Sequence, residues 1–168
     1  MKTIVKTPRL LIREFVQDDL DNLARLFGDA EVMKYMGDEV FTRDTSKAEL
    51  DKCLGHYRER GWGMWALCLN ETSEFIGRCG FLVWDLPEVQ GTEVSFALLP
   101  EHWGKGYATE GATAVRDYAF QDLGLDRVIS IVDPPNLASI RVAEKVHDGL
   151  EAKITFFGRP MQIFASTR

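Results

Sequence analysis

The residues with the clearest chemical potential lie in a short turn, where Gly104 and Gly106 flank Lys105 between a strand-like run and a helix-like run. Backbone N–H groups at the start of a helix lack partners within it and carry the positive end of its dipole. Glycines let a pyrophosphate approach the main chain without meeting a Cβ atom. The turn therefore predicts an anion site, and a glycine-rich connector without a ligand is the alternative.

Two other nucleotide-binding motifs do not match this turn. A Walker loop requires Ser or Thr directly after Gly-Lys, but Gly106 follows Lys105. The dinucleotide-binding fingerprint requires a third glycine at the position where Thr109 stands. Neither of these modes of nucleotide binding is predicted.

A carboxylate stands on the strand that precedes the turn. Side chains alternate along a strand, so Glu93 shares one face with Ser95 and Ala97, while Val94 and Phe96 lie on the other. The first face is polar and small enough to border a cleft. A solvated charge on the strand is the alternative interpretation of Glu93. Other carboxylates that could approach the same site are Glu39, Glu74 and Glu110.

The periodicity of apolar residues predicts the elements that position these groups. The strand–helix–strand order from 93 to 132 implies one parallel right-handed crossover. We expect one α/β (α+β) domain over residues 1–168, with a mixed, mostly antiparallel sheet of six to seven strands and about four helices. The expected strands are 9–13, 65–69, 75–83, 93–99 and 127–132, with a closing hairpin of 150–157 and 161–164. The expected helices are 18–28, 45–60, 107–123 and one that Asp133-Pro134 opens and that runs to about Val146.

Composition excludes several classes of protein. The formal charge of −6 is spread along the chain, which argues against nucleic-acid binding. No run approaches the roughly 18 apolar residues of a membrane span, and the N-terminal apolar segment is too short for a signal peptide, so a cytoplasmic protein is expected. Cys53, Cys68 and Cys79 contain no CxxC pair and are expected to be buried free thiols. The scattered histidines predict no metal site.

The segment Trp103-Gly-Lys-Gly-Tyr-Ala-Thr-Glu110, with the strand before it and Asn136-Leu-Ala-Ser139 and Glu144-Lys145 after it, resembles the GCN5-related N-acetyltransferases, or GNAT family. It looks most similar to their ribosomal-protein N-terminal acetyltransferase branch. The resemblance extends over nearly the whole chain. It implies that acetyl-coenzyme A is the co-substrate, and that the acceptor is a primary amine of a protein N-terminus or a small molecule, attacking the thioester directly.

The resemblance also implies which residues bind the co-substrate. Main-chain groups of Phe96, Ala97 and Leu98 would contact the pantetheine arm like an added strand, and Asn136 would hydrogen-bond the same arm. Glu101 departs from the family pattern, which has Arg or Gln there, but the turn acts mainly through its backbone N–H groups. The residues implied to surround the pyrophosphate are Trp103, Gly104, Lys105, Gly106, Tyr107, Ala108 and Thr109.

The same resemblance implies catalytic roles. An amine is mostly protonated at neutral pH, and Glu93 matches the glutamate that commonly acts as general base in the family. Ala143 occupies the position of the family's usual tyrosine acid, and Ser139 matches the serine proposed as proton donor in the ribosomal-protein branch. A first-turn serine that only satisfies the backbone is the alternative for Ser139. His147 follows Glu144-Lys145 where the family pattern differs, and it is interpreted as a solvated residue at the helix end.

Acceptor recognition is expected from the first two helices and the loops at the strand ends. Three functions stay open: acetylation of protein N-termini, acetylation of a small molecule such as a polyamine, amino sugar, antibiotic or amino-acid derivative, and non-catalytic sensing of acyl-coenzyme A. The sequence does not separate a monomer from a homodimer. Aromatic residues that could line a pocket, or could belong to the core, are Phe41, Trp62, Trp65 and Trp84. Acidic residues that could attract an amine are Asp38, Glu39 and Asp85.

Overall fold

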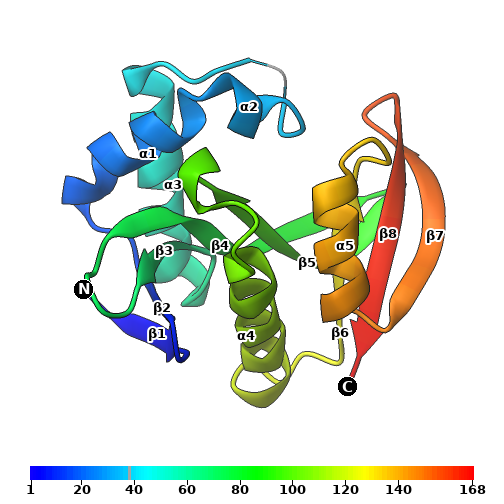
Figure 1. The fold of residues 1–168 in the computed structure, drawn as a ribbon. Helices are drawn as coiled ribbons and strands as arrows, with labels where there is room; N and C mark the ends of the chain where they lie inside the picture. Colours follow the sequence, from blue (N-terminus) through cyan, green and yellow to red (C-terminus); the bar gives the residue numbers. More distant parts are fainter. Residues whose placement is uncertain (38) are drawn as a thin grey trace.

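The computed structural model describes residues 1–37 and 39–168. In these residues one eight-stranded sheet has the order β1-β2-β3-β4-β5-β6-β8-β7 (Figure 1). Neighbouring strands are antiparallel except β5 and β6, which are parallel. The predicted fold class is confirmed, with more strands than expected because 3–6 pairs with β2 at the sheet edge. The strands are β1 (Thr3–Lys6), β2 (Leu10–Arg13), β3 (Met64–Leu69), β4 (Phe75–Leu86), β5 (Val89–Leu98), β6 (Arg127–Val132), β7 (Gly149–Phe156) and β8 (Arg159–Thr167).

Helices cover both faces of the sheet. The first three pack on one face around buried residues such as Leu23, Leu50 and Ala97. The last two pack on the opposite face with Val94, Val115 and other apolar residues. The helices are α1 (Leu20–Phe27), α2 (Ala30–Met33), α3 (Arg43–Arg60), α4 (Tyr107–Gln121) and α5 (Leu137–Val146), with short 3₁₀ turns η1 (Gln17–Asp19) and η2 (Pro100–His102) (Figure 1). No helix in the described part of the chain has both the length and the apolar composition to span a membrane.

A third apolar cluster is built by strands alone. Its buried members, such as Val89, Ile129, Phe156 and Ile163, come from β5, β6, β7 and β8, and the partly buried Trp84 of β4 packs against them. The predicted buried state of the three cysteines is confirmed, since all are free and buried. Burial raises the pKa of Cys53 to about 11 and that of Cys79 to about 12.

The start of α5 differs from the prediction that Asp133-Pro134 opens this helix. Asp133 instead forms an ion pair with Arg159 of β8. Two consecutive prolines follow it, and a residue that precedes proline is disfavoured in the α conformation. The helix therefore begins at Leu137, and Asn136 caps it by accepting a hydrogen bond from the Ser139 N–H at 3.1 Å.

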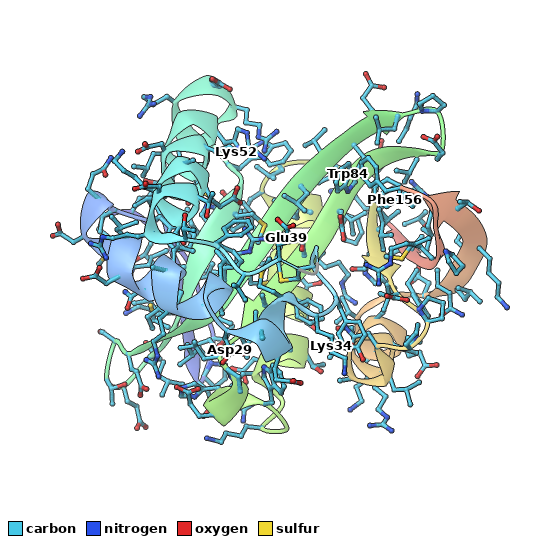
Figure 2. The ribbon with its side chains drawn as sticks, turned by 90° about the horizontal axis from the view of Figure 1, so that it is seen from above. Asp29, Lys34, Glu39, Lys52, Trp84 and Phe156 are labelled. Carbon is cyan, nitrogen blue, oxygen red and sulfur yellow. The ribbon has the colours of Figure 1, made fainter. Side chains whose placement is uncertain are left out.

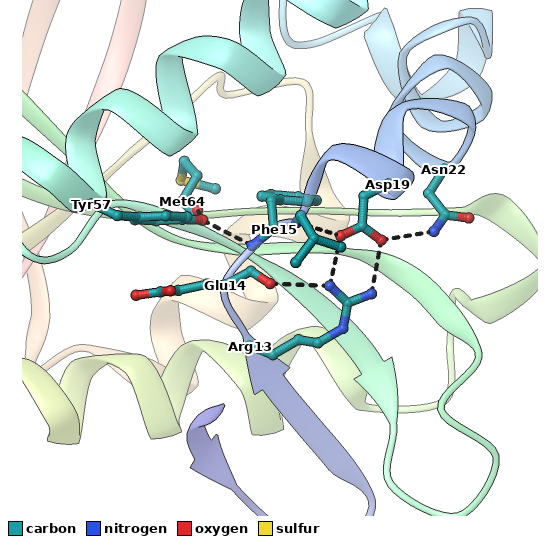
Figure 3. A network of polar contacts seen from close by, with 8 residues as sticks. Arg13, Glu14, Phe15, Asp19, Asn22, Tyr57 and Met64 are labelled. Carbon is teal, nitrogen blue, oxygen red and sulfur yellow. Dashed lines mark hydrogen bonds and ion pairs between the residues drawn. The ribbon is translucent and has the colours of Figure 1, made fainter. Parts of the chain in front are cut away.

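A buried ion pair fixes the connection between β2 and α1 (Figure 3). Arg13 donates to the two carboxylate oxygens of Asp19 at 2.7 and 2.8 Å. Asp19 also accepts from the Val16 N–H at 2.9 Å and from the Asn22 side chain at 3.0 Å. Beside this pair, the Tyr57 hydroxyl accepts from the Phe15 N–H at 3.2 Å. These contacts set the position of α1, and of α3 behind it, against the sheet.

Candidate active site

The glycine-rich turn lies between η2 and α4. Gly104 and Gly106 have φ values of +71° and +81°, in the left-handed region that favours glycine. A Cβ atom at Gly104 would meet nothing within 4 Å. Gly106 is the N-cap of α4 and supplies no side chain to cap it, so the N–H groups of 107–109 have no partner within the helix. The turn thus presents backbone donors at the positive end of a 15-residue helix.

Arg9, just before β2, holds this turn from the side. Its Nη1 donates to the carbonyl oxygen of Lys105 at 2.9 Å, and its guanidinium lies 4.8 Å from the centre of the Tyr107 ring. Its Nε donates to Glu110 at 2.6 Å, and Thr7 donates to the same carboxylate at 2.6 Å. Burial would raise the pKa of Glu110, but the hydrogen bonds from Thr7 and Arg9 lower it. The sequence pattern places Arg9 only in a strand, because a contact across about a hundred residues leaves no local signal.

Two further contacts secure the chain before the turn. Glu101, at the position where the family pattern has Arg or Gln, forms an ion pair with Arg25 of α1. The Trp103 indole N–H donates to the carbonyl oxygen of Leu98 at 2.7 Å, although 47% of Trp103 stays exposed. Glu74, one of the other candidate carboxylates, lies 3.4 Å from buried His102 instead. The turn is therefore attached to α1, β2 and β5.

Strands β5 and β6 part beside Glu93. Within residues 1–37 and 39–168, Glu93 and Ile129 form the one ladder pair between them. Directly beyond it, the Ser130 hydroxyl donates to the carbonyl oxygen of Val94 at 2.7 Å, and the Ile131 N–H donates to Glu93 Oε1 at 3.3 Å. The side chains of Ser130 and Glu93 thus form hydrogen bonds with main-chain groups that would pair with each other if the two strands continued side by side. Because the two strands are parallel, the chain leaves both at one edge, which places the starts of α4 and α5 on that edge (Figure 1).

Glu93 is a buried carboxylate with two fixed donors. Only 7% of the residue is exposed. The Trp84 indole N–H donates to Oε2 at 2.6 Å, and the Ile131 N–H donates to Oε1. Burial raises the pKa of Glu93 to about 7, and the two hydrogen bonds oppose part of this rise. The carboxylate is thereby poised to gain or lose a proton near neutral pH. The predicted alternation along β5 is confirmed, because Ala97 packs under α1 and α3 while Val94 packs under α4.

Asn136 and Ser139 lie at the start of α5. The Asn136 side-chain oxygen caps α5 by accepting a hydrogen bond from the Ser139 N–H. Both side chains are half-buried. Ala143, at the position of the family's tyrosine, is buried on the inner side of the helix.

The interpretation of His147 as a solvated residue is wrong. Only 6% of it is exposed, with Nε2 at 2.8 Å from the Ser130 hydroxyl and Nδ1 at 3.1 Å from the Ser166 hydroxyl. The Ser130 proton goes to Val94, so Ser130 accepts from Nε2–H, and Nδ1 accepts from Ser166. The chain after α5 turns inward toward β8, which carries the ring into the core. Burial, with the charge of Arg116, lowers the pKa of His147 to about 4.

The buried imidazole makes stability depend on pH. The His147 imidazole takes up a proton below about pH 6.5 in the unfolded chain but only below about pH 4 in the folded chain. The free energy of unfolding is therefore not reduced by this group above about pH 6.5 and decreases as the pH falls from 6.5 to 4. We expect His147→Gln to cost about 1–3 kcal/mol at neutral pH, because it disturbs two buried hydrogen bonds. The variant is also expected to lose less stability on acidification. Melting curves at about pH 7.5 and pH 5 check this, and parallel losses in both proteins would contradict it.

The other aromatic and acidic residues considered from the sequence are dispersed. Trp65 is fully buried in the core, and Trp62 packs edge-on against Phe81 at 5.4 Å between ring centres. Trp84 contacts Phe156 of β7, as Figure 2 shows, and is the aromatic residue among these that reaches Glu93 by a hydrogen bond. Phe41 packs against Phe27. Glu39 and Asp85 are exposed, and Asp38 lies outside the described residues.

Known proteins resemble this chain in sequence and in fold. Residues 9–147 match the family model described as an acetyltransferase (GNAT) domain. An uncharacterised N-acetyltransferase, p20 of Bacillus licheniformis, is 34% identical over 81% of this chain and 76% of its own length. Spermidine N(1)-acetyltransferase of Escherichia coli K12 is 28% identical over 85% of this chain and 74% of its own length. The crystal structure of an acetyltransferase from Agrobacterium tumefaciens has a TM-score of 0.84 and 26% identity, covering 100% of this chain and 95% of that one.

Proposed function

This chain belongs to the GNAT family of N-acetyltransferases, and from that premise we propose that it moves an acetyl group from acetyl-coenzyme A to a primary amine, with Glu93 as general base. The observation that carries the role of Glu93 is its environment. A carboxylate with a pKa of about 7 accepts a proton readily at neutral pH, whereas one with an ordinary pKa is a much weaker base. Its two fixed donors keep it in one orientation.

The turn before α4 suits the diphosphate of the co-substrate. Gly104 and Gly106, in the left-handed conformation, leave the approach to the turn free of Cβ atoms. The first N–H groups of α4 point out of the helix at the positive end of its dipole, where an anion binds. Phe96, Ala97 and Leu98 lie on the part of β5 beyond its last pair with β6, where an extended arm could add to the strand edge. When bound, the co-substrate supplies the activated acetyl group as a thioester.

Glu93 and Ser139 are proposed to serve two different proton transfers, one at the amine and one at the thiolate. Glu93 takes a proton from the ammonium group, directly or through one water, and leaves a neutral amine. The nitrogen forms the bond to the acetyl carbon while the carbon–sulfur bond breaks, and the second nitrogen proton passes to the departing thiolate, which leaves as the free thiol. Ser139, at the start of α5, is the proposed group through which a proton reaches the departing thiolate. Asn136 is proposed to orient the pantetheine arm while its side-chain oxygen caps α5.

The acceptor is proposed to be either a protein N-terminus or a small amine. Both present a primary amine to the same carboxylate. The spermidine acetyltransferase among the relatives supports a small amine, and the resemblance to the ribosomal-protein branch supports an N-terminus.

The first test uses two glycines with matched geometry at opposite ends of the α4 region. Gly106 precedes the helix with φ +81°, and Gly124 follows it with φ +66° and no neighbour near its Cβ position. Alanine at either position costs about 1–2 kcal/mol of stability because of the left-handed backbone. We expect Gly106→Ala to weaken coenzyme A binding at least about tenfold, since it disturbs the donors of the turn.

The measurement is the rise in melting temperature caused by coenzyme A, together with thiol release from acetyl-coenzyme A in the presence of a panel of amines. Gly124→Ala is expected to keep the wild-type response to coenzyme A. Equal loss of that response in both variants, or no thiol release by the wild type with any amine, contradicts the proposal.

A further inference from the structure

A cavity of about 490 Å³ lies between the tips of two hairpins, the β4–β5 turn and the β7–β8 turn. Leu86, Pro87 and Glu88 line it from the first, and Phe156 and Phe157 from the second. Its volume lies within the range of small-molecule sites. The sequence carries no local signal for this cavity, because the two hairpins that line it are about seventy residues apart.

The cavity wall is connected to Glu93 through one side chain. The Phe157 ring lies 4.5 Å from the Phe156 ring and 6.4 Å from the Trp84 ring, measured between centres. Phe156 packs edge-on against Trp84 at 5.1 Å, and Figure 2 shows these two rings together at one end of β4. Trp84 in turn donates its indole N–H to Glu93. The wall residue Phe156 and then Trp84 thus connect the cavity to the carboxylate.

The backbone conformation of Phe157 is energetically unfavourable for a bulky residue. It is 76% exposed, and its φ of +48° places it in the left-handed region that a bulky residue rarely adopts. Asn or Gly would fit this turn without that strain. The exposed ring of Phe157 continues the aromatic surface of Phe156 beside the cavity, so that an apolar group in the cavity would contact both rings.

From these contacts we infer that the acceptor is a primary amine with an aromatic or bulky apolar substituent and no neighbouring carboxylate. The substituent sits against Phe157 and Phe156, while the amine lies on the Glu93 side of Trp84. Glu88 on the wall and exposed Asp85 next to it repel an anionic acceptor and attract a cationic one. This inference rests on the proposed function and narrows its acceptor. An arylalkylamine and a peptide that begins with Phe share this chemistry.

The test compares acceptors that differ in one feature. Phenylethylamine is set against ethanolamine, which lacks the apolar ring, against phenylalanine, which adds a carboxylate, and against spermidine. Peptides beginning with Phe or Ser distinguish a protein N-terminus from a free amine as the source. We expect kcat/KM for phenylethylamine or the Phe peptide to exceed that for each polar counterpart by at least about tenfold, the effect of burying one apolar group.

Phe157→Asn is the matched variant, because Asn tolerates the left-handed turn and removes the apolar ring. It is expected to reduce the preference for phenylethylamine over ethanolamine about tenfold, mainly through KM. Leu150→Thr is the control, since Leu150 is a 49% exposed apolar residue on the same hairpin but outside the aromatic cluster. It is expected to leave the preference unchanged.

Two outcomes overturn the inference and are distinguishable. Efficient turnover of spermidine or ethanolamine, with a selectivity that Phe157→Asn does not alter, refutes the apolar acceptor but keeps the transferase proposal. Absence of thiol release with every amine refutes both.

Discussion

Glu93→Gln is expected to lower kcat roughly 100- to 1,000-fold while leaving the KM for acetyl-coenzyme A nearly unchanged. Glutamine keeps the shape of the side chain but cannot accept a proton. The loss should therefore fall on the chemical step and spare binding of the co-substrate. Steady-state thiol release with a fixed acceptor measures it.

The pH profile sharpens this prediction. The raised pKa means that Glu93 becomes the active carboxylate only as the pH rises through about 7. We expect kcat/KM of the wild type to climb across this range and then level, and the limb to vanish in the Gln variant. Trp84→Phe removes the stronger of the two hydrogen bonds that lower the pKa, so its limb should move to higher pH.

Two controls separate catalysis from folding. Burying a carboxylate with a raised pKa destabilises the folded state as the pH rises to about 7, and Gln removes this penalty although its single acceptor oxygen keeps only one of the two hydrogen bonds. Glu93→Gln should therefore melt close to the wild type at about pH 8. Glu39→Gln alters an exposed carboxylate of the α2–α3 connection, labelled in Figure 2, and should change kcat less than about twofold. An active Glu93→Gln enzyme, or an equal loss in Glu39→Gln, would show that another group takes the proton.

The largest expected effect on stability comes from Asp19→Ala, at about 3–5 kcal/mol. Without Asp19, the buried guanidinium of Arg13 keeps its charge, loses both hydrogen bonds to the carboxylate and retains the one to the Glu14 carbonyl oxygen, while the Val16 N–H loses its acceptor. For a chain of this size the change corresponds to a fall in melting temperature of about 10 °C. Thermal unfolding followed by circular dichroism measures it.

A surface ion pair nearby supplies the matched control. Asp21 of α1 pairs with Arg43 of α3, but the two side chains are 80% and 63% exposed. Asp21→Ala is expected to cost less than about 1 kcal/mol. Restoring stability in the double variant Arg13→Met with Asp19→Ala would confirm that the uncompensated charge is the cause. Similar losses for Asp19→Ala and Asp21→Ala would contradict the assigned importance of burial.

The network has a further consequence for the site. The lowered pKa of Asp19 arises because hydrogen bonds from Arg13, Val16 and Asn22 outweigh its burial. Its contribution to stability is therefore present at neutral pH and is lost as the pH falls through the acidic range. Because Arg25 of the same helix α1 pairs with Glu101 before the glycine-rich turn, loosening α1 also loosens the anchor of that turn.

Local sequence patterns were sufficient to predict most of the helices and strands. The 127–132 strand is observed with its predicted ends. Helix α3 begins at Arg43, two residues earlier than predicted, and ends as predicted before Gly61, whose backbone is left-handed. The N-terminal strand β1 and the one-turn helix α2 were missed, because four residues give too little periodicity. The start of α5 was misplaced, because Asp133 has a distant partner in Arg159.

The fold class, the glycine turn before α4 and the face of the strand on which Glu93 stands are predictable from the sequence, since each depends on residues within a few positions of one another. The environment of these groups arises only when the chain folds. The pKa of Glu93 depends on Trp84 and on strand β6, the turn depends on Arg9, and His147 is buried by β6 and β8. Desolvation and hydrogen bonding are set by whatever the fold brings alongside, and this information is not local in the chain.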